Sequence, residues 1–201
     1  AVPTVEPAAT ATPTVPAGFT THEDPEAGFA IDYPAEWYLT VPAAEARREA
    51  QAYTASIRST SPDTEQPRGQ SIDPNETGID VTVWRTQAAT FEETVTERRE
   101  EIRNSEMGTQ IAAEEMITLP SGLPAVQWEL ETGMAGTVRE VMTYLAGNRI
   151  MVDGMGDLSQ FDAIAMTLRP LEQDGATGPN AGAGVDGETV VFESLGLAVR
   201  I

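Results

Sequence analysis

One short stretch near the N-terminus limits the possible folds of this chain more than any other part of the sequence. Phe29, Ile31 and Tyr33 alternate with small or polar residues, which is the period-two pattern of a β-strand with one buried face. Pro34 must end that strand, because its ring removes the backbone N–H that a sheet would use next. Trp37 follows and offers a large apolar surface for a turn to fold over the end of a sheet. We therefore predict a strand, a turn and an aromatic plug in close succession.

The stretch has the pattern G-F-x-I-x-Y-P-x-x-W over residues 28–37, and it resembles the opening of PsbP-like domains, where this signature follows a short acidic first strand. The order of predicted elements from Phe19 to Leu171 is also similar, and the chain most resembles the bacterial lipoprotein branch of that family. The family includes a photosystem extrinsic protein, a nuclear import factor that binds a small GTPase, and many bacterial lipoproteins of unknown role. The resemblance therefore implies a fold and leaves the function open.

The hydrophobic patterns predict a series of strands and three helices. The predicted strands cover residues 19–23, 29–33, 53–60, 79–84, 109–119, 126–130, 138–146 and 149–155, residues 38–41 are expected to be extended, and the predicted helices cover 43–52, 90–105 and 158–168. Most strands follow one another without an intervening helix. This succession favours an α+β fold in which an antiparallel β-sheet is flanked by α-helices, as the resemblance also implies, over a parallel βαβ sheet.

Two local patterns make the prediction more specific. Gly147 and Asn148 have the composition of a two-residue hairpin turn, which would place Leu145 opposite Ile150 and Tyr144 opposite Met151. In the helix of residues 90–105, Thr90 and Glu93 form a capping box. One stripe of that helix holds Phe91, Val95, Arg98 and Ile102. The opposite side of the helix carries charges of both signs, which is typical of a solvated face.

The chain divides into four parts by composition. Residues 1–18 form a Thr/Pro/Ala-rich tether, residues 19–171 the PsbP-like domain, and residues 172–187 a Gly/Ala-rich linker. When Gly196 is aligned with Gly28, residues 188–201 repeat the apolar alternation of the first domain's opening strand, and the chain stops where Pro-x-x-Trp would be due. We therefore predict that residues 188–201 begin a second, truncated related domain. The competing interpretation is an added edge strand on the first sheet.

The charge of the chain limits its partners. It has 32 acidic residues against 12 basic ones, all of them arginine, for a formal net charge of −20. Such a surface repels phosphate backbones, so we expect no nucleic-acid partner, and it favours cationic partners or divalent cations. A genome-wide compositional bias explains the same numbers without a dedicated cationic partner, and we favour it. The absence of cysteine excludes disulfides, thiolate metal sites and a cysteine nucleophile.

We expect no transmembrane segment, because no apolar run approaches the roughly 18 residues that span a bilayer. No signal peptide is recognisable and the sequence starts at Ala1, so we expect a processed or trimmed form with a possible lipid anchor upstream.

One pattern suggests a metal. Asp73, Asn75 and Thr77, followed by Gly78, copy the first half of a calcium-binding loop, in which alternating oxygen ligands precede a glycine turn. Trp84 occupies the position at which such a loop supplies a bidentate glutamate, so an Asx-type turn is the competing interpretation. Calcium is thus the one cofactor that the sequence indicates, and we predict no other.

Catalytic constellations are scarce. His22 is the only histidine, and no Gly-x-Ser-x-Gly motif exists, so we assign no catalytic residue. Trp84 and Trp128 suit either a binding groove or the core of a sheet. Met142, Met151 and Met155 suit either a soft-metal site or core packing. The many carboxylates leave open a hydrolytic pair, which requires two carboxyl groups facing each other across a cleft.

These observations favour a non-enzymatic, extracytoplasmic binding or scaffold module of a surface lipoprotein or secreted protein. Its partner at the cell surface is an unknown protein or small ligand. The alternatives are a hydrolase that uses paired carboxylates and a calcium-dependent surface module.

Overall fold

The computed structural model describes residues 15–61, 76–106, 108–133, 136–171, 190–192 and 197–199. Residues 1–171 and 172–201 are separate units, and each is considered by itself. No helix among the described residues is long and apolar enough to cross a membrane.

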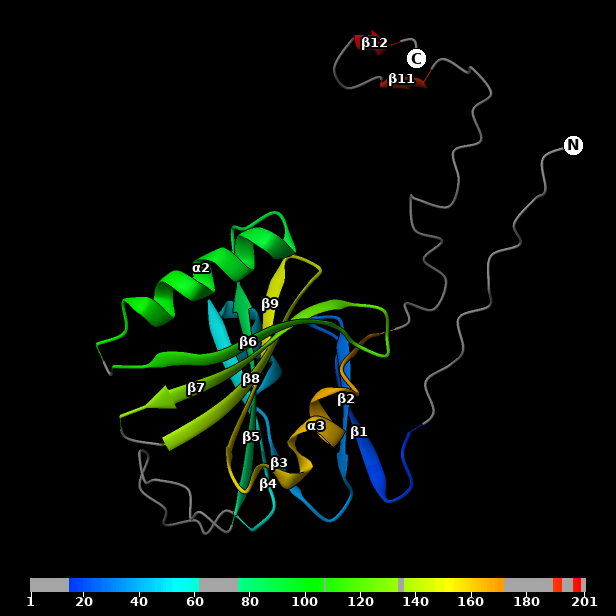
Figure 1. Ribbon diagram of the computed structural model, residues 1–201. Coiled ribbons are helices and arrows are strands. Elements are labelled where there is room, and N and C mark those ends of the chain that lie inside the picture. The colour runs from blue at the N-terminus through cyan, green and yellow to red at the C-terminus, as the bar shows by residue number, and fades with distance from the viewer. Residues whose placement is uncertain are drawn as a thin grey trace, which may run out of the picture. The chain divides into compact units, whose positions relative to one another are not determined.

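A seven-stranded antiparallel sheet forms the main layer of the first unit (Figure 1). Its strands, in spatial order, are β3 (Tyr38–Thr40), β4 (Ala52–Arg58), β5 (Thr77–Arg85), β9 (Asn148–Gly156), β8 (Gly136–Leu145), β7 (Pro124–Thr132) and β6 (Gln110–Thr118). Every neighbouring pair is antiparallel, so the predicted antiparallel sheet is confirmed and a doubly wound parallel sheet is excluded.

The opening stretch forms the centre of a second, three-stranded sheet. Its strands are β1 (Phe19–Asp24), β2 (Phe29–Pro34) and β10 (Arg169–Pro170), with β2 in the middle. The alternation predicts one buried face for β2, but all six of its residues are buried. The polar face is covered because Asp32 accepts a hydrogen bond from Arg169 at 2.9 Å, while its backbone N–H donates to the Thr167 hydroxyl at 2.8 Å. Gly28 takes φ +75° in the preceding turn, a conformation that glycine adopts without strain.

Helices cover the large sheet only in part. Helix α2 (Phe91–Arg103) lies on one side of it, and α3 (Phe161–Ala165) lies with the small sheet on the other (Figure 1). The predicted helix of residues 158–168 is shorter than expected, since its first turn is a 3₁₀ helix, η1 (Leu158–Gln160), and α3 ends at Ala165. Helix α1 (Ala44–Glu49) is a short connection between β3 and β4. The prediction of a sheet flanked by helices is therefore correct for one part of the sheet only.

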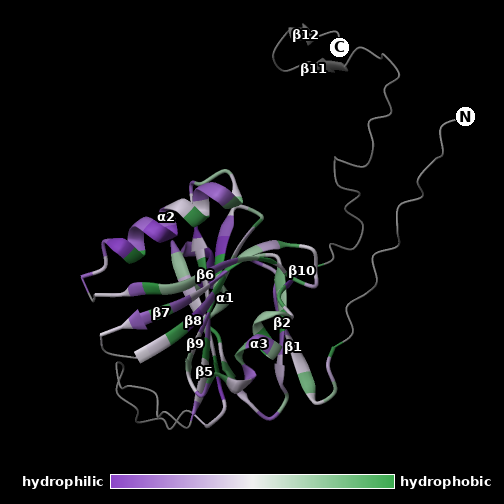
Figure 2. Ribbon diagram, viewed as in Figure 1, coloured by the Kyte–Doolittle hydropathy of each residue, from purple (hydrophilic) through white to green (hydrophobic). Residues whose placement is uncertain are grey.

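Two apolar cores follow from this layering. The first lies between the two sheets and α3 and includes Phe29, Ile31 and Phe161, with Trp37 packed against it. The second lies between the large sheet and α2 and includes Phe91 and Trp128. Figure 2 shows that α2 is otherwise a largely hydrophilic helix, as expected for one with a single buried stripe.

The turn between β8 and β9 differs from the prediction by one residue. Ala146 and Gly147 are its central residues, with φ of 51° and 82°, so that Tyr144 pairs with Arg149 and Leu145 with Asn148. Two positive φ values define a type I′ turn, which favours glycine at its second position. The sequence-based register instead placed Gly147 at the first central position of the turn, and the predicted pairs were wrong for that reason.

In the second unit, β11 (Val190–Phe192) and β12 (Leu197–Val199) form an antiparallel pair. The linker of residues 172–187 and the tether of residues 1–14 lie outside the described residues.

Candidate functional site

A row of polar side chains crosses the face of the large sheet that carries α2. Ser56 on β4 pairs with Asp80 on β5, Asp80 with Asp153 on β9, and Asp153 with Glu140 on β8. Directly paired residues on one face of a sheet have side chains within reach of one another. We call Asp80, Asp153 and Glu140 the carboxylate row, and it is the densest group of carboxylates that this face offers.

Glu140 is held by an arginine from the helix above it. It is completely buried and accepts two hydrogen bonds from Arg98, Nε to Oε1 at 2.9 Å and Nη2 to Oε2 at 2.5 Å. This is the bidentate geometry that makes arginine–carboxylate pairs strong and directional. Burial lowers the pKa of Arg98, but its bonds to Glu140 outweigh this and raise the pKa overall, so the guanidinium stays charged.

Asp80 is also paired, whereas Asp153 lies between the two pairs. The Oδ1 atom of Asp80 accepts from the Ser56 hydroxyl and from Arg58 Nη2, both at 2.7 Å. Burial raises the pKa of Asp153 well above its ordinary value, and the charge of Glu140 and a hydrogen bond to it act in the same direction. Asp153 thus favours its protonated form beside the charge of Glu140.

The carboxylate row contains neighbouring carboxyl groups, as a catalytic acid–base pair does. In the described part of the chain, however, these groups do not line a groove that could admit a substrate. Glycoside hydrolysis needs two carboxyl groups separated by roughly 5–9.5 Å across a space that admits the substrate. Arg98 and α2 cover Glu140 instead, and neither of the two grooves described below includes Asp80, Asp153 or Glu140. The arrangement can hold a proton and anchor α2 on the sheet.

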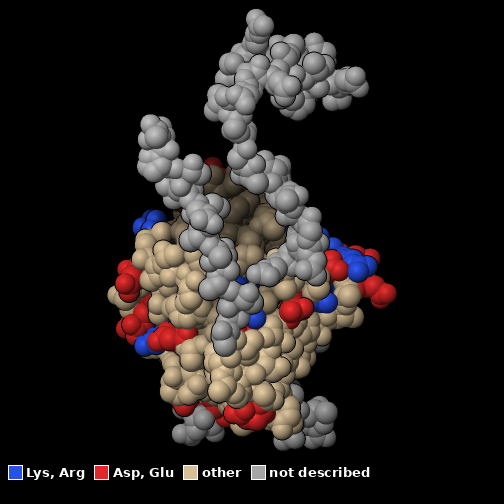
Figure 3. All heavy atoms as spheres, turned by 90° about the vertical axis from the view of Figure 1, so that its right-hand side faces the viewer, with Lys and Arg blue, Asp and Glu red and all other residues tan. Residues whose placement is uncertain are grey.

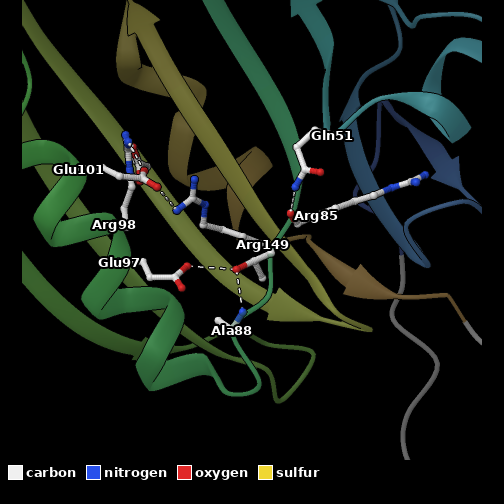
Figure 4. Close-up of polar contacts among 9 residues, drawn as sticks. Gln51, Arg85, Ala88, Glu97, Arg98, Glu101 and Arg149 are labelled. Carbon is white, nitrogen blue, oxygen red and sulfur yellow. Dashed lines mark hydrogen bonds and ion pairs between the residues drawn. The ribbon is translucent and has the colours of Figure 1, made fainter.

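A second arginine, Arg149, lies at the end of the same face (Figure 4). Its side chain is only 2% exposed, and its Nη1 donates to Glu101 of α2 at 2.8 Å. Its guanidinium lies 5.2 Å from the ring centroid of Trp84, which is a cation–π distance. Glu101 also accepts from Arg98 at 3.3 Å, so two arginines share this glutamate. The buried Nε of Arg149 has no hydrogen-bond partner among the described residues.

The loop between β5 and α2 is fixed by polar contacts around this cluster (Figure 4). Thr86 donates to Glu97 at 3.1 Å and accepts from the backbone N–H of Ala88 at 3.0 Å. The Gln51 amide donates to the carbonyl of Arg85. These bonds help to set where α2 begins.

His22 has no partner suited to catalysis. Its ring lies edge-on to Phe29 with centroids 6.2 Å apart, and its buried Nε2 has no hydrogen-bond partner among the described residues. Burial lowers the pKa of His22, and the charge of Asp24 opposes this shift. Asp24 already has two hydrogen-bond partners, because its Oδ2 accepts from Arg47 at 2.9 Å and from Tyr53 at 2.8 Å. The histidine is therefore a packing residue of β1.

The calcium prediction falls mainly outside the described residues. Asp73 and Asn75 lie there, whereas Thr77 opens β5 and donates from its hydroxyl to the carbonyl of Asp157 at 2.8 Å. Among the residues that the structure describes, no group of three or more acidic, histidine or cysteine side chains could hold a metal ion. The site of Asp73, Asn75 and Thr77 stays a prediction.

The tryptophans and methionines belong mostly to the core. Trp128 is completely buried and donates from Nε1 to Glu114 at 2.9 Å, whereas Trp84 is 40% exposed. Met142 pairs with Met151 in the second core, and Met155 packs against it. Met142, Met151 and Met155 therefore fill the space under α2.

Two open grooves have acidic linings. One, of about 400 Å³, lies over β6, β7 and β8 and is lined by Ala113, Glu114, Glu115, Gln127, Trp128, Glu129, Arg139 and Asp162. Arg139 is engaged there by Asp162 at 3.0 Å. The other, of about 420 Å³, runs beside α2 along Glu97, Glu100, Glu101 and Asn104. On the face shown in Figure 3, acidic and basic side chains lie near one another across the middle, and further acidic side chains lie at the lower edge.

Sequence reasoning missed the carboxylate row. The alternation of residues 79–84 places Asp80 on the polar side of its strand, and the structure shows that its side chain is only 21% exposed. The available signal was Arg98, which stands on the apolar stripe of a predicted helix and therefore needs a buried acidic partner.

Comparison with known proteins bears on the fold alone. No protein-family model and no curated protein matches the chain. Among solved structures, the solution structure of cyanobacterial PsbP (CyanoP) from Synechocystis sp. PCC 6803 has a TM-score of 0.50 and 13% identity. The alignment covers 82% of this chain and 99% of CyanoP.

Two further structures are less similar. A protein of unknown function from Pseudomonas aeruginosa, PA94, described as a putative regulator, has a TM-score of 0.39 and 15% identity, over 71% of this chain and 85% of that one. A Bacteroides thetaiotaomicron protein has a TM-score of 0.41 and 11% identity, and the alignment covers 78% of this chain and 50% of that one. The opening signature, the layering of the two sheets and the similarity to CyanoP together give the first unit of this chain a PsbP-like fold.

Proposed function

We propose that the chain is a non-enzymatic binding or scaffold module that works outside the cytoplasm, on a surface lipoprotein or a secreted protein. The observation that carries this proposal is the state of the carboxylate row. Its two outer members, Asp80 and Glu140, are paired with Arg58 and Arg98, and Glu140 is completely buried. Side chains that could perform hydrolysis are thus used to hold the fold together.

The location is supported by composition and fold. A Thr/Pro/Ala-rich tether of residues 1–18 precedes a PsbP-like domain, and such tethers commonly separate an anchored N-terminus from a surface domain. The bacterial lipoprotein branch and a lipid anchor upstream belong to the same proposal. The net charge of −20 favours a cationic partner.

The compartment is tested by a reporter. Alkaline phosphatase, which becomes active only after export, is fused after Leu171 of the native gene product in the source organism. We expect active phosphatase on intact cells. An inactive fusion that is present at normal abundance would overturn the extracytoplasmic location.

A carboxylate-dependent hydrolase is the second candidate, and the raised pKa of Asp153 beside Glu140 favours it. The purified chain and the Asp153→Asn variant are assayed against chromogenic glycosides and esters. The binding proposal predicts no turnover by either protein. Turnover that the variant loses, with unchanged folding by circular dichroism, would establish the hydrolase instead.

A further inference from the structure

We propose that the outer edge of β6 docks an extended, basic segment of a partner protein, which adds to the large sheet as an eighth strand. This inference rests on the proposed binding function and names the chemistry of the partner. It is carried by the backbone of β6, by the side chains beside it, and by the charges that prevent two copies of this chain from pairing there.

The backbone of β6 offers the longest open edge that the structure describes. Strand β6 is the last strand in the order of the large sheet, and among the described residues it pairs with β7 alone. It has nine residues, against three in β3 at the opposite edge and six in β1 at the edge of the small sheet. Seven of its nine residues are exposed. Its outer N–H and C=O groups are therefore available to another strand.

The side chains along this edge differ on the two faces of the sheet. Met116 is 56% exposed and lies on the face of α2, opposite Val126. Glu115 lies on the other face, opposite Gln127, and lines the groove of about 400 Å³ together with Glu129. An added strand would alternate in the same way. A partner strand that fits this edge has apolar side chains beside Met116 and lysine or arginine beside Glu115.

Charge argues against a second copy of this chain as the occupant. Glu115 is exposed, so antiparallel pairing of two such strands about this residue places two glutamates opposite each other, whereas Glu114 is already paired with Arg99 and Trp128. Like charges placed opposite each other destabilise a strand pair, and edge charges are a common defence against self-association. Ile111 and Ala113 also flank a bulge that interrupts the first part of the strand. The same Glu115, with Glu129 beside it in the groove, attracts a basic strand.

The composition of the chain permits a selective test. Because the sequence has no lysine, a zero-length carbodiimide reagent that joins carboxylates to primary amines cannot link one side chain of this protein to another. The full chain is treated in the presence of a synthetic peptide in which lysine and valine alternate. A peptide in which glutamate and valine alternate serves as the charge control. Links are located by mass spectrometry, and backbone protection is followed by amide hydrogen exchange.

We expect links at Glu115 and Glu129, slower exchange at alternate amides of β6, and an affinity that falls as salt is added. The double variant Glu115→Gln, Glu129→Gln should lower the affinity about tenfold, as two partly exposed ion pairs imply. Glu45→Gln, at an exposed position in the first turn of α1, is the matched control and should bind like the unchanged chain.

Unchanged exchange along β6, links confined to other carboxylates, or equal binding of the two peptides would overturn the inference. Dimers formed through β6 would also overturn it. These outcomes leave the proposed function standing, because the phosphatase fusion and the turnover assay do not involve β6. An inactive fusion or a measured turnover would remove the proposed function without any change at this edge.

Discussion

Asp153 is the one member of the carboxylate row that no arginine neutralises by a hydrogen bond among the described residues. Asp80 accepts from Arg58 and Glu140 from Arg98, whereas Asp153 faces both acids from the strand between them. Its raised pKa follows from burial first and from the charge of Glu140 second. A buried carboxyl group in this position costs stability whenever it is ionised.

The pH dependence of folding should therefore change in Asp153→Asn. The pKa of Asp153 is higher in the folded chain than its ordinary value of 3.8, so the folded state holds the proton more tightly and stability falls as the pH rises from about 4 through the folded pKa. The amide does not titrate, so the variant should be more stable than the unchanged chain at about pH 8, by about 1.4 kcal/mol per unit of pKa difference.

Urea unfolding at a series of pH values measures this change. The control is Asp80→Asn, which loses its ion pair with Arg58 and should be less stable at neutral pH. A variant Asp153→Asn that is less stable than the unchanged chain at about pH 8 would contradict the prediction.

Arg98 and Glu140 are expected to be strongly coupled. Replacing Arg98 by Met leaves Glu140 buried without a cation, which should cost roughly 3 kcal/mol of unfolding free energy. Adding Glu140→Gln to Arg98→Met should recover part of that loss, since the buried charge is then gone. Denaturant unfolding of the unchanged chain, the two single variants and the double variant gives the coupling free energy between Arg98 and Glu140. Additive losses would show that the pair does not act as a unit.

At the scale of elements, α2 shows what the sequence predicts and where the prediction stops. Its capping box is present, with Thr90 accepting from the backbone N–H of Glu93 at 3.2 Å, although the Glu93 carboxylate accepts from Ala89 and not from Thr90. The apolar stripe is buried as predicted, and Arg98 stands on it. The partner of Arg98 lies 42 residues away.

That partner could not be predicted because the carboxylate row depends on strand register. The period-two pattern assigns Asp80, Glu140 and Asp153 to faces of their strands, but it does not say which residues are opposite one another. The one register that the sequence suggested, in the β8–β9 hairpin, was displaced by the position of Gly147 in the turn. Elements were thus largely predictable from local patterns, whereas the site required pairings between distant strands.

Contact between α3 and β9 should depend on Gly154. A Cβ atom built at this residue would lie 2.3 Å from Cδ2 and 2.9 Å from Cε2 of Phe161, and 3.0 Å from Leu158. Because Phe161 is completely buried, Gly154→Ala must displace α3, at a cost of about 1–3 kcal/mol. Thermal unfolding measures the loss. The smaller side chain of Phe161→Leu should reduce the loss of stability that Gly154→Ala causes. An equal loss in the unchanged chain and in Phe161→Leu would show that the added methyl group does not act through Phe161.

At the scale of the whole molecule, the pairing of β11 with β12 repeats that of β1 with β2. Val190 pairs with Val199, Val191 with Ala198 and Phe192 with Leu197. Each of these six residues stands 168 positions after its counterpart in the pairs His22–Ile31, Glu23–Ala30 and Asp24–Phe29. The alignment of Gly196 with Gly28, made from sequence alone, has the same offset. Equal register in two hairpins is what two copies of one opening motif produce.

We therefore predict that residues 188–201 are the first hairpin of a second PsbP-like unit and do not contribute to the stability of the first. The large and small sheets and both cores of the first unit are complete by Leu171, so a chain shortened to residues 1–171 should unfold at the same temperature and with the same urea dependence as residues 1–201. In any longer product of the gene, the repeat places a proline directly after Ile201 and a tryptophan three residues beyond that proline. A drop in the unfolding temperature of the shortened chain would instead favour the competing interpretation, in which residues 188–201 add an edge strand to the first sheet.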